Sequence, residues 1–261
     1  MFQTLITEID AGVGIVTLNR PERHNAFDDT MIAELAEAMQ SMTNDPGVRV
    51  VVISSVGKSF CAGADLAWMQ RAATYDFEQN QYDAGQLAEM LRRIADCPKP
   101  VIARVQGPAY GGGVGLISAC DLAVATFETK FALSEVKLGL IPAVIGPHVL
   151  AAIGERYARR YMLTAEAFSA AEAYRIGLLH EMVGDETALD EVVGEWIDAL
   201  LKNGPQALAG VKSLLRSIAG RPLGPKVIDY TVGRIARTRV SPEGQEGVAA
   251  FIEKRKPNWI A

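Results

Sequence analysis

Apolar and polar residues alternate at the start of the chain and then change to a helical period. The alternation over 4–9 and 14–18, with a glycine-containing turn between the runs, predicts a β-hairpin. From Asp28 or Asp29 onward the apolar residues recur about every 3.6 positions, which predicts a capped amphipathic helix. Strand-like and helix-like runs then alternate as far as residue 183. This order is typical of an α/β body.

The other elements of this body follow from the same two patterns. Strands are predicted at 49–54, 101–105, 122–125, 130–133 and 179–183, and helices from 65, at 76–96, 113–119, 144–153, 155–163 and 170–176. A capping box of Ser169 and Glu172 begins the last of these helices, and Gly177 ends it. The segment 134–142 is predicted to be an apolar loop.

Beyond about residue 185 the pattern is helical only. Four helices are expected, at 187–202, 205–219, 224–238 and 242–254, with Pro205, Pro222 and Pro242 dividing the region. We therefore expect a core over 1–195 and a C-terminal helical region over 196–261. Strand, glycine turn and helix recur at 50–65 and 101–115, which indicates a spiral of ββα units.

The composition is that of a globular protein and excludes several classes. Apolar residues make up 49% and charged residues 22%, which excludes a disordered chain. The net charge of −5 speaks against nucleic acid and anionic membranes as partners. Three separated cysteines, with no CxxC pair and no histidine cluster, indicate free thiols in a reducing compartment and no metal site. With no secretory signal or apolar span, we expect a cytoplasmic protein.

Two glycine-containing turns each lead from a strand run into a helix. The first covers Ser59–Asp65 and the second is Gly111-Gly112-Gly113. The N–H groups at the start of a helix have no intrahelical acceptor and lie at the positive end of the helix dipole. Two such groups aimed at one point stabilise an oxygen that becomes negative during a reaction. We predict that the N–H groups of Ala64 and Gly112 do this, although turn glycines without a chemical role are the simpler interpretation.

Six sequence motifs together resemble a known family. They are Asn19-Arg20-Pro21-Glu22 with Asn25-Ala26, Phe60–Asp65, Lys99–Ala103, Gly111–Gly113, Ala119-Cys120-Asp121 and Leu138–Pro142, in this order. Over nearly its whole length the chain resembles the crotonase (enoyl-CoA hydratase/isomerase) superfamily. This implies an α/β crotonase spiral of ββα units with a C-terminal helical trimerisation region, assembled as a homotrimer or as a homohexamer (a dimer of trimers). It also implies an acyl-CoA substrate whose thioester oxygen lies between Ala64 and Gly112, with no separate cofactor.

Within this superfamily the chain looks most like bacterial 3-methylglutaconyl-CoA hydratases of leucine breakdown. The similarity lies in 61–66 with 68–69, in 105–107, 111–116, 133–143 and 160–166, and in the tail segments 243–247 and 251–257. The implied reaction adds water across the double bond of a 2-enoyl thioester. The cations Arg71, Lys137 and Arg159 are candidates for the far carboxylate of such a substrate.

The expected chemistry needs proton transfer, and here the chain departs from the pattern. Family hydratases commonly use two glutamates, and the matching positions are Gly115 and Glu135, so one is kept. We predict that Glu135 is the acid/base, because apolar neighbours such as Leu133 and Val136 raise the pKa of a carboxyl group. The simpler alternative is a surface glutamate that pairs with Lys137 or caps a helix. Family isomerases that move a double bond from position 3 to position 2 also keep only this glutamate, so a Δ3,Δ2-enoyl-CoA isomerase is the second hypothesis.

The resemblance also assigns binding residues. Those for coenzyme A are Arg23, Ala26, Ala62, Ala64, Asp65, Leu66, Phe251 and Lys254, and those for the acyl pocket are Trp68, Gly111, Gly115, Pro142 and His148. Phe251 and Lys254 match positions that reach a neighbouring subunit's coenzyme A. Simpler interpretations are a helix cap for Asp65, an exposed charge for Arg23 and a structural role for His148.

Two further function classes are weighed against this one. The resemblance suggests an RNA-binding protein as an alternative, but the acidic balance speaks against it. A serine protease with a spiral fold is the other, but no serine lies in a recognisable histidine-partnered motif.

Overall fold

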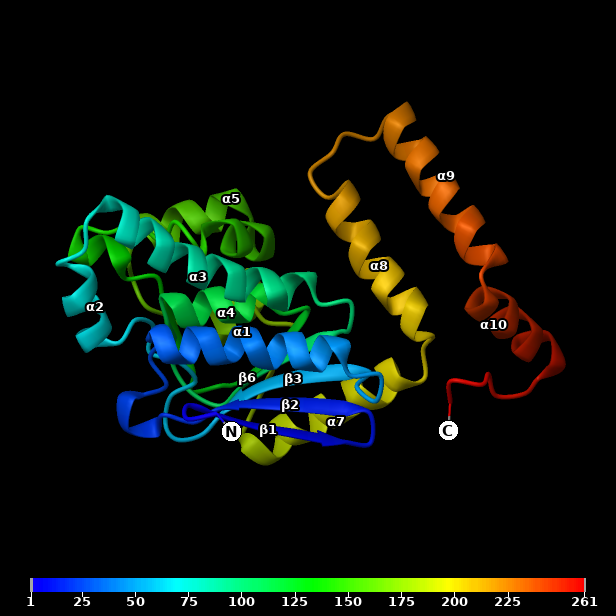
Figure 1. Cartoon of the computed structure of the whole chain (residues 1–261), viewed down its shortest axis with the longest axis horizontal. Helices are drawn as coiled ribbons and strands as arrows, with labels where there is room; N and C mark the ends of the chain where they lie inside the picture. The colour runs from blue at the N-terminus through cyan, green and yellow to red at the C-terminus, as the bar shows by residue number, and fades with distance from the viewer. Residues whose placement is uncertain (1, 261) are drawn as a thin grey trace.

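The hairpin at the start of the chain forms one edge of a six-stranded sheet in the computed structural model, which describes residues 2–260 (Figure 1). Strands β1 (Leu5–Asp10) and β2 (Val13–Leu18) pair antiparallel. The sheet continues in parallel through β3 (Val50–Ser55), β4 (Val101–Val105), β6 (Leu122–Thr126) and β9 (Glu181–Val183). Every residue of β3 is buried, as expected of a parallel strand covered on both faces.

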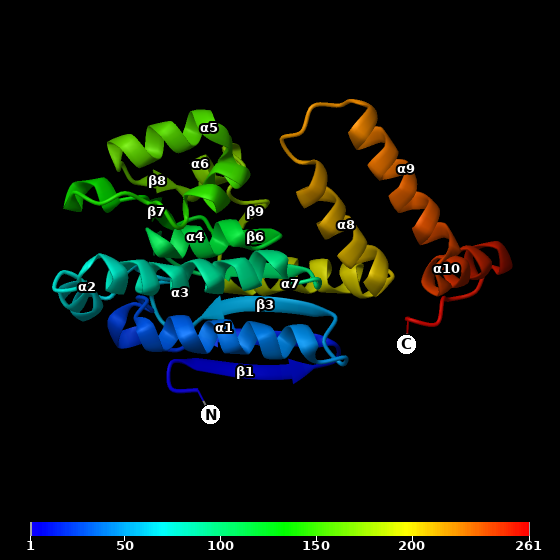
Figure 2. The same cartoon turned by 45° about the horizontal axis from the view of Figure 1, so that its top comes forward.

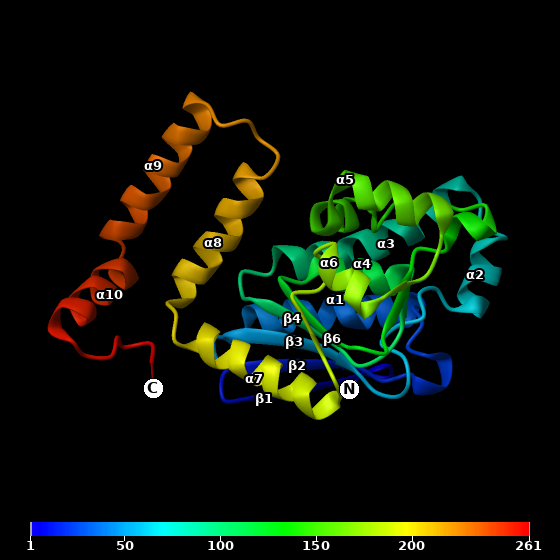
Figure 3. The same cartoon turned by 180° about the vertical axis from the view of Figure 1, so that it is seen from behind.

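Helices cover both faces of this sheet. Helices α1 (Asp29–Asn44), α3 (Phe77–Asp96) and α4 (Gly112–Ala119) pack with one face around the larger apolar core. Helix α7 (Glu186–Leu201) covers the other face, as Figures 1 and 3 show, and buries Leu189 and Val193 there. The predicted cap of α1 is Asp28, whose side chain accepts from the N–H of Met31.

A second, three-stranded sheet lies beside the first glycine turn. It is formed by β5 (Ala109–Tyr110), β7 (Lys130–Ala132) and β8 (Phe168–Ser169). An isolated parallel bridge of Cys61 with Ala109 joins this sheet to the first turn, and a second bridge, of Phe27 with Ala64, joins that turn to the segment before α1. Residues far apart in the sequence therefore meet at the predicted site.

The remaining elements of the body differ from the predictions in detail. They are the 3₁₀ helices η1 (Pro21–Arg23) and η2 (Glu135–Leu138) and the α-helices α2 (Leu66–Ala72), α5 (Gly146–Thr164) and α6 (Ala170–Arg175). The segment predicted to be only a loop thus contains η2. The backbone at Gly154 breaks α5 with φ 71°, close to the predicted division into two helices.

Helix α6 carries only half of the predicted capping box. Ser169 accepts from the N–H of Glu172. The Glu172 carboxylate instead accepts from Arg175 at 2.6 Å and from the hydroxyl of Tyr161, so it does not return to the cap. Gly177 follows the helix with φ 88°, as predicted for its C-terminal residue.

Helices α8 (Pro205–Ile218), α9 (Pro225–Val240) and α10 (Pro242–Glu253) form an arm that stands away from the body (Figures 1 and 2). No residue of α8 or α9 is buried within the chain. The expected boundary at 195/196 falls inside α7, whose C-terminal part still packs on the sheet, so the arm begins at Gly204 instead.

An ion pair and hydrogen bonds connect the arm to the body, and the hydrogen bonds lie at both ends of the arm. Lys212 of α8 forms an ion pair with Asp121. Arg49 donates to the carbonyl of Asn203 at 2.7 Å, before the arm, and to that of Trp259 at 3.1 Å, after it. Within residues 2–260 no helix is long and apolar enough to cross a membrane.

Candidate active site

The two glycine turns lie against each other. The N–H of Tyr110 donates to the carbonyl of Cys61 at 2.9 Å. A Cβ atom placed on Gly63 would lie 3.7 Å from the nitrogen of Gly112 and 2.9 Å from the carbonyl oxygen of Tyr110. Gly63 also has φ 87°, so this position requires glycine for both its space and its backbone conformation. The turns that were predicted to act together are therefore in contact.

The direction of the Ala64 N–H follows from the bonds on either side of it. The carbonyl of Gly63 accepts from the N–H of Phe27 at 2.6 Å, and the N–H of Asp65 donates to the carbonyl of Phe27 at 2.8 Å. In a trans peptide the C=O and N–H groups point in opposite directions. The N–H of Ala64 therefore points away from Phe27, and it has no acceptor within residues 2–260.

The Gly112 N–H is left free in the same way. The carbonyl of Gly111 accepts from the N–H groups of Val114 and Gly115 at 3.0 and 3.2 Å. Gly112 is the first residue of α4, so its N–H has no intrahelical acceptor and lies at the positive end of the helix. Two unpaired N–H groups on adjoining segments can together bind an oxygen that gains negative charge.

Glu135 lies beside this pair of N–H groups. A Cβ atom placed on Gly111 would lie 3.0 Å from Oε1 of Glu135, so the carboxyl group packs against the start of α4. Its Oε2 atom is buried and has no hydrogen-bond partner in the described part of the chain. Burial raises the pKa of the Glu135 carboxyl. The predicted alternative, an ion pair with Lys137, is not among the contacts of residues 2–260.

Ile145 occupies the place of the second glutamate. A Cβ atom on Gly115 would lie 2.6 Å from Cβ of Ile145 and closer still to its Cγ2. Ile145 is buried against α4, so it has little room to move. No side chain larger than hydrogen fits at Gly115 while Ile145 is present.

Several of the residues assigned to coenzyme A gather at the first turn. Asp65 caps α2, as its simpler interpretation predicted, by accepting from Ala67 at 2.8 Å and Trp68 at 3.2 Å. Burial alone would raise the pKa of Asp65, but these N–H groups and the charges of Arg20 and Arg23 lower it. Of the other residues assigned to coenzyme A near this cap, Arg23 and Leu66 are exposed, Ala62 is partly exposed and Ala26 is buried.

The residues assigned to the acyl pocket lie on different elements. Trp68 is buried in α2, and its Nε1 donates to Asp83 of α3 at 3.1 Å. Pro142 is half-buried after η2. His148 lies in the first turn of α5, where burial lowers its pKa and the charge of Asp96 raises it.

Phe251 and Lys254 lie at the far end of the arm. Both are exposed, and Lys254 follows α10 in the left-handed conformation. Figures 1 and 3 show α10 well apart from α2 and α4, so a single chain does not bring these two residues to Ala64 and Gly112.

A histidine–serine contact occurs near the first turn. Nδ1 of His24 lies 3.0 Å from Oγ of Ser59, and the contact is exposed. Within the described residues no carboxylate bonds to the other ring nitrogen of His24. A catalytic triad needs that third group.

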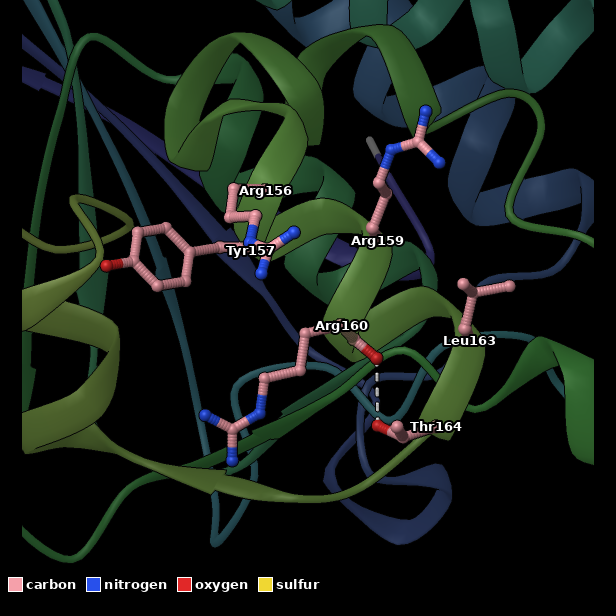
Figure 4. A pocket seen from close by; sticks show the side chains of 6 residues that line it. All are labelled: Arg156, Tyr157, Arg159, Arg160, Leu163 and Thr164. Atoms are coloured by element: carbon pink, nitrogen blue, oxygen red, sulfur yellow. Dashed lines mark hydrogen bonds between the residues drawn. The ribbon is translucent and has the colours of Figure 1, made fainter.

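Two surface hollows lie away from the glycine turns. One of about 490 Å³ is lined by Arg156, Tyr157, Arg159, Arg160, Leu163 and Thr164 of α5 (Figure 4). The other, of about 440 Å³, lies between α1 and α3. Of the predicted site residues only Arg159, a candidate for the far carboxylate, lines the first hollow, and neither hollow contains Ala64, Gly112 or Glu135.

Comparisons with known proteins identify the family. The model of the enoyl-CoA hydratase/isomerase family matches residues 8–261. The chain belongs to the enoyl-CoA hydratase/isomerase family. The crystal structure of an enoyl-CoA hydratase from Shewanella pealeana superposes with a TM-score of 0.97 at 46% identity, over 99% of this chain and 97% of that one. The predicted α/β crotonase fold is thereby confirmed.

Relatives in this family catalyse more than one reaction. The crotonyl-CoA hydratase of Syntrophomonas wolfei is 32% identical over an alignment of 263 positions, which covers 100% of this chain and 99% of the relative. The 1,2-epoxyphenylacetyl-CoA isomerase of Escherichia coli is 32% identical over an alignment of 267 positions, which covers 99% of each chain. Family membership therefore leaves both hydration and isomerisation open.

Two site features were not predicted from the sequence. The contact of Ile145 with Gly115 joins residues 30 positions apart, and no pattern in the sequence pairs them. The ion pairs of Arg20 were also missed, although its motif Asn19-Arg20-Pro21-Glu22 was noted. The signal that could have found Ile145 is the missing side chain at Gly115, because a close neighbour must fill that space.

Proposed function

We propose that this protein adds water to the double bond of a 2-enoyl-CoA thioester. The observation that supports this most is the buried, unpartnered Oε2 of Glu135 beside two free N–H groups on adjoining turns. Ala64 and Gly112 would hold the thioester oxygen, and Glu135 would move the protons.

The reaction follows from these positions. Glu135 takes a proton from water as its oxygen bonds to Cβ of the substrate, and the electron pair of the double bond moves onto the thioester oxygen. The N–H groups of Ala64 and Gly112 stabilise this enolate, and one such donor contributes about 3 kcal/mol to lowering a barrier. Glu135 then returns the proton to Cα, which gives a 3-hydroxyacyl-CoA. The raised pKa of Glu135 suits both steps.

The proposed substrate is 3-methylglutaconyl-CoA. Ile145 and Trp68, two buried apolar side chains, are proposed to contact the branched acyl group. Of the three cations considered for the far carboxylate, Arg71 pairs with Asp29 at 2.6 Å and Arg159 with Glu155 at 2.6 Å. Lys137 is exposed on η2, two residues after Glu135, and has no ion pair within residues 2–260.

A Δ3,Δ2-enoyl-CoA isomerase is the second candidate. The packing of Ile145 against Gly115 favours it, because moving a proton from one carbon to another needs only one carboxylate. The relation to an isomerase of Escherichia coli is compatible with this reaction.

Spectroscopy of the conjugated thioester separates the two reactions. A hydratase removes the conjugated absorbance of crotonyl-CoA or 3-methylglutaconyl-CoA and forms a 3-hydroxyacyl-CoA, whereas an isomerase creates that absorbance from a 3-enoyl-CoA. No loss with either 2-enoyl-CoA would reject hydration. If Lys137 binds the far carboxylate, Lys137→Ala raises KM for 3-methylglutaconyl-CoA and leaves KM for crotonyl-CoA unchanged.

The arm is proposed to assemble the chain as a homotrimer or as a dimer of trimers. Ile228, Val232 and Ile235 of α9 form an exposed apolar stripe with helical spacing. In such an assembly Phe251 and Lys254 would reach the coenzyme A of a neighbour. Sedimentation of the wild type and of a Val232→Asp variant tests this, and a wild type that sediments as a monomer would reject it.

A further inference from the structure

Arg20 joins the two segments that hold the first N–H donor. Its Nη1 lies 2.7 Å from Oδ2 of Asp28, and its Nη2 lies 3.4 Å from Oδ2 of Asp65. Nη1 also donates to the carbonyl of Ala26 at 3.1 Å. The side chain is only 16% exposed, so these bonds form in a largely desolvated place where they are stronger than on the surface.

Both aspartates divide their oxygens between a helix and Arg20. Oδ1 of Asp28 accepts from the N–H of Met31 at 2.8 Å and begins α1. Oδ1 of Asp65 accepts from the N–H of Ala67 at 2.8 Å and begins α2. The planar guanidinium can contact both remaining Oδ2 atoms, whereas the single ammonium of a lysine offers no such fork. Arg20 therefore fixes the start of one helix relative to the other.

The peptide group that carries the Ala64 N–H lies between these two caps. Phe27 precedes Asp28 and bonds on both sides of that peptide, to the carbonyl of Gly63 at 2.6 Å and the N–H of Asp65 at 2.8 Å. A shift of one cap relative to the other would pull on these two bonds. The peptide would rotate, and the N–H of Ala64 would turn away from its present direction.

We propose that Arg20 is a positioning residue of the oxyanion hole, which it serves by holding the caps Asp28 and Asp65 in register. This inference rests on the proposed function. Arg20 acts through the peptide of Gly63 and Ala64 and has no contact of its own with the reacting atoms. Its loss should weaken transition-state stabilisation more than it weakens ground-state binding of coenzyme A.

The test compares Arg20→Gln and Arg20→Lys with Arg104→Gln. Arg104 is a matched control, because it is 15% exposed and also contacts two carboxylates, Asp190 and Glu186, but does so at α7 on the far face of the sheet. We expect Arg20→Gln to lower kcat by about 10-fold to 100-fold with KM changed by less than about threefold, the loss typical of a misplaced catalytic group. Arg20→Lys should keep most of the thermal stability and still lose activity, and Arg104→Gln should lose stability alone.

A spectroscopic readout separates positioning from stability. Infrared difference spectra of a saturated acyl-CoA, carbon-13-labelled at the thioester carbonyl, report how strongly the bound oxygen is hydrogen-bonded. In Arg20→Gln and Arg20→Lys this band should move back toward its position in solution, and in Arg104→Gln it should not. Folded Arg20 variants with an unshifted band or near-normal kcat would overturn the inference, and if Arg20→Gln does not fold, Arg20→Lys decides. A wild type that leaves the band at its solution position would reject the proposed function itself.

Discussion

Two sides of the candidate site meet the start of α4 with opposite chemistry. At Gly111 the neighbour is the buried carboxyl group of Glu135, and at Gly115 it is the side chain of Ile145. Gly111 is the N-terminal cap of α4 and Gly115 lies in its first turn, so both neighbours contact the start of this helix. In a site with two glutamates both approaches would be acidic. Here a single acid faces an apolar wall formed by Ile145. Residue 115 must be glycine, because Ile145 leaves no space for a Cβ atom there.

Removing the acid from the first side should have the largest effect. We expect Glu135→Gln to lower kcat by about 10²-fold to 10⁴-fold, the usual contribution of general acid–base catalysis, while acyl-CoA still binds. Steady-state kinetics and calorimetric binding of a saturated acyl-CoA measure the two effects separately. Glu128→Gln, an exposed glutamate in the turn between β6 and β7, is the control. Retained turnover in Glu135→Gln would assign the proton transfer to another group.

Placing an acid on the second side should fail unless the wall is removed. Gly115→Glu alone overpacks the contact with Ile145, and Ile145→Gly alone leaves a cavity, so each should destabilise the protein by about 1–5 kcal/mol. In the double variant the glutamate fills the space that Ile145 leaves. Its loss of unfolding free energy should therefore be smaller than the sum of the two single losses by about 1–3 kcal/mol. Denaturant unfolding of the four proteins measures this coupling. Additive effects would show that Ile145 does not fill the place of the missing carboxyl group.

The pH dependence of the rate tests the environment of the remaining acid. Burial raises the pKa of Glu135 above its ordinary value of 4.5, and the group must be ionised to take a proton from water. The value of kcat/KM should therefore fall as the pH is lowered through this raised pKa, at a pH where an exposed carboxyl would still be ionised. Initial rates from quenched assays at a series of acidic pH values give kcat/KM as a function of pH. A rate that stays constant down to about pH 4.5 would contradict a buried base.

Much of the scaffold of the site could be predicted from sequence, because it depends on neighbours along the chain. The cap Asp65, the two glycine turns and the β-branched runs before them each carry a local signal. The contacts between Gly115 and Ile145 and between Arg20 and Asp65 depend on how separate turns pack, and no local signal records this. The half-formed box at Ser169 has a partly local cause, because its Glu172 carboxylate accepts from Arg175 of the same helix as well as from Tyr161 of α5.

The smallest expected effect is a gain of stability at high pH when Glu135, the acid of the first side, is replaced. Because the pKa of Glu135 is raised in the folded state, its contribution to stability is fully present below its ordinary pKa of 4.5 and is lost as the pH rises through the raised value. Glutamine resembles the protonated carboxyl group and does not ionise, so its contribution to stability does not change over this pH range. Glu135→Gln should therefore have a higher Tm than the wild type at pH 8 and nearly the same Tm at pH 4, whereas Glu128→Gln should show no such difference. A lower Tm of Glu135→Gln at pH 8 would mean that the carboxylate is held by favourable bonds, and the contrast between an unsatisfied acid and a well-packed isoleucine would be lost.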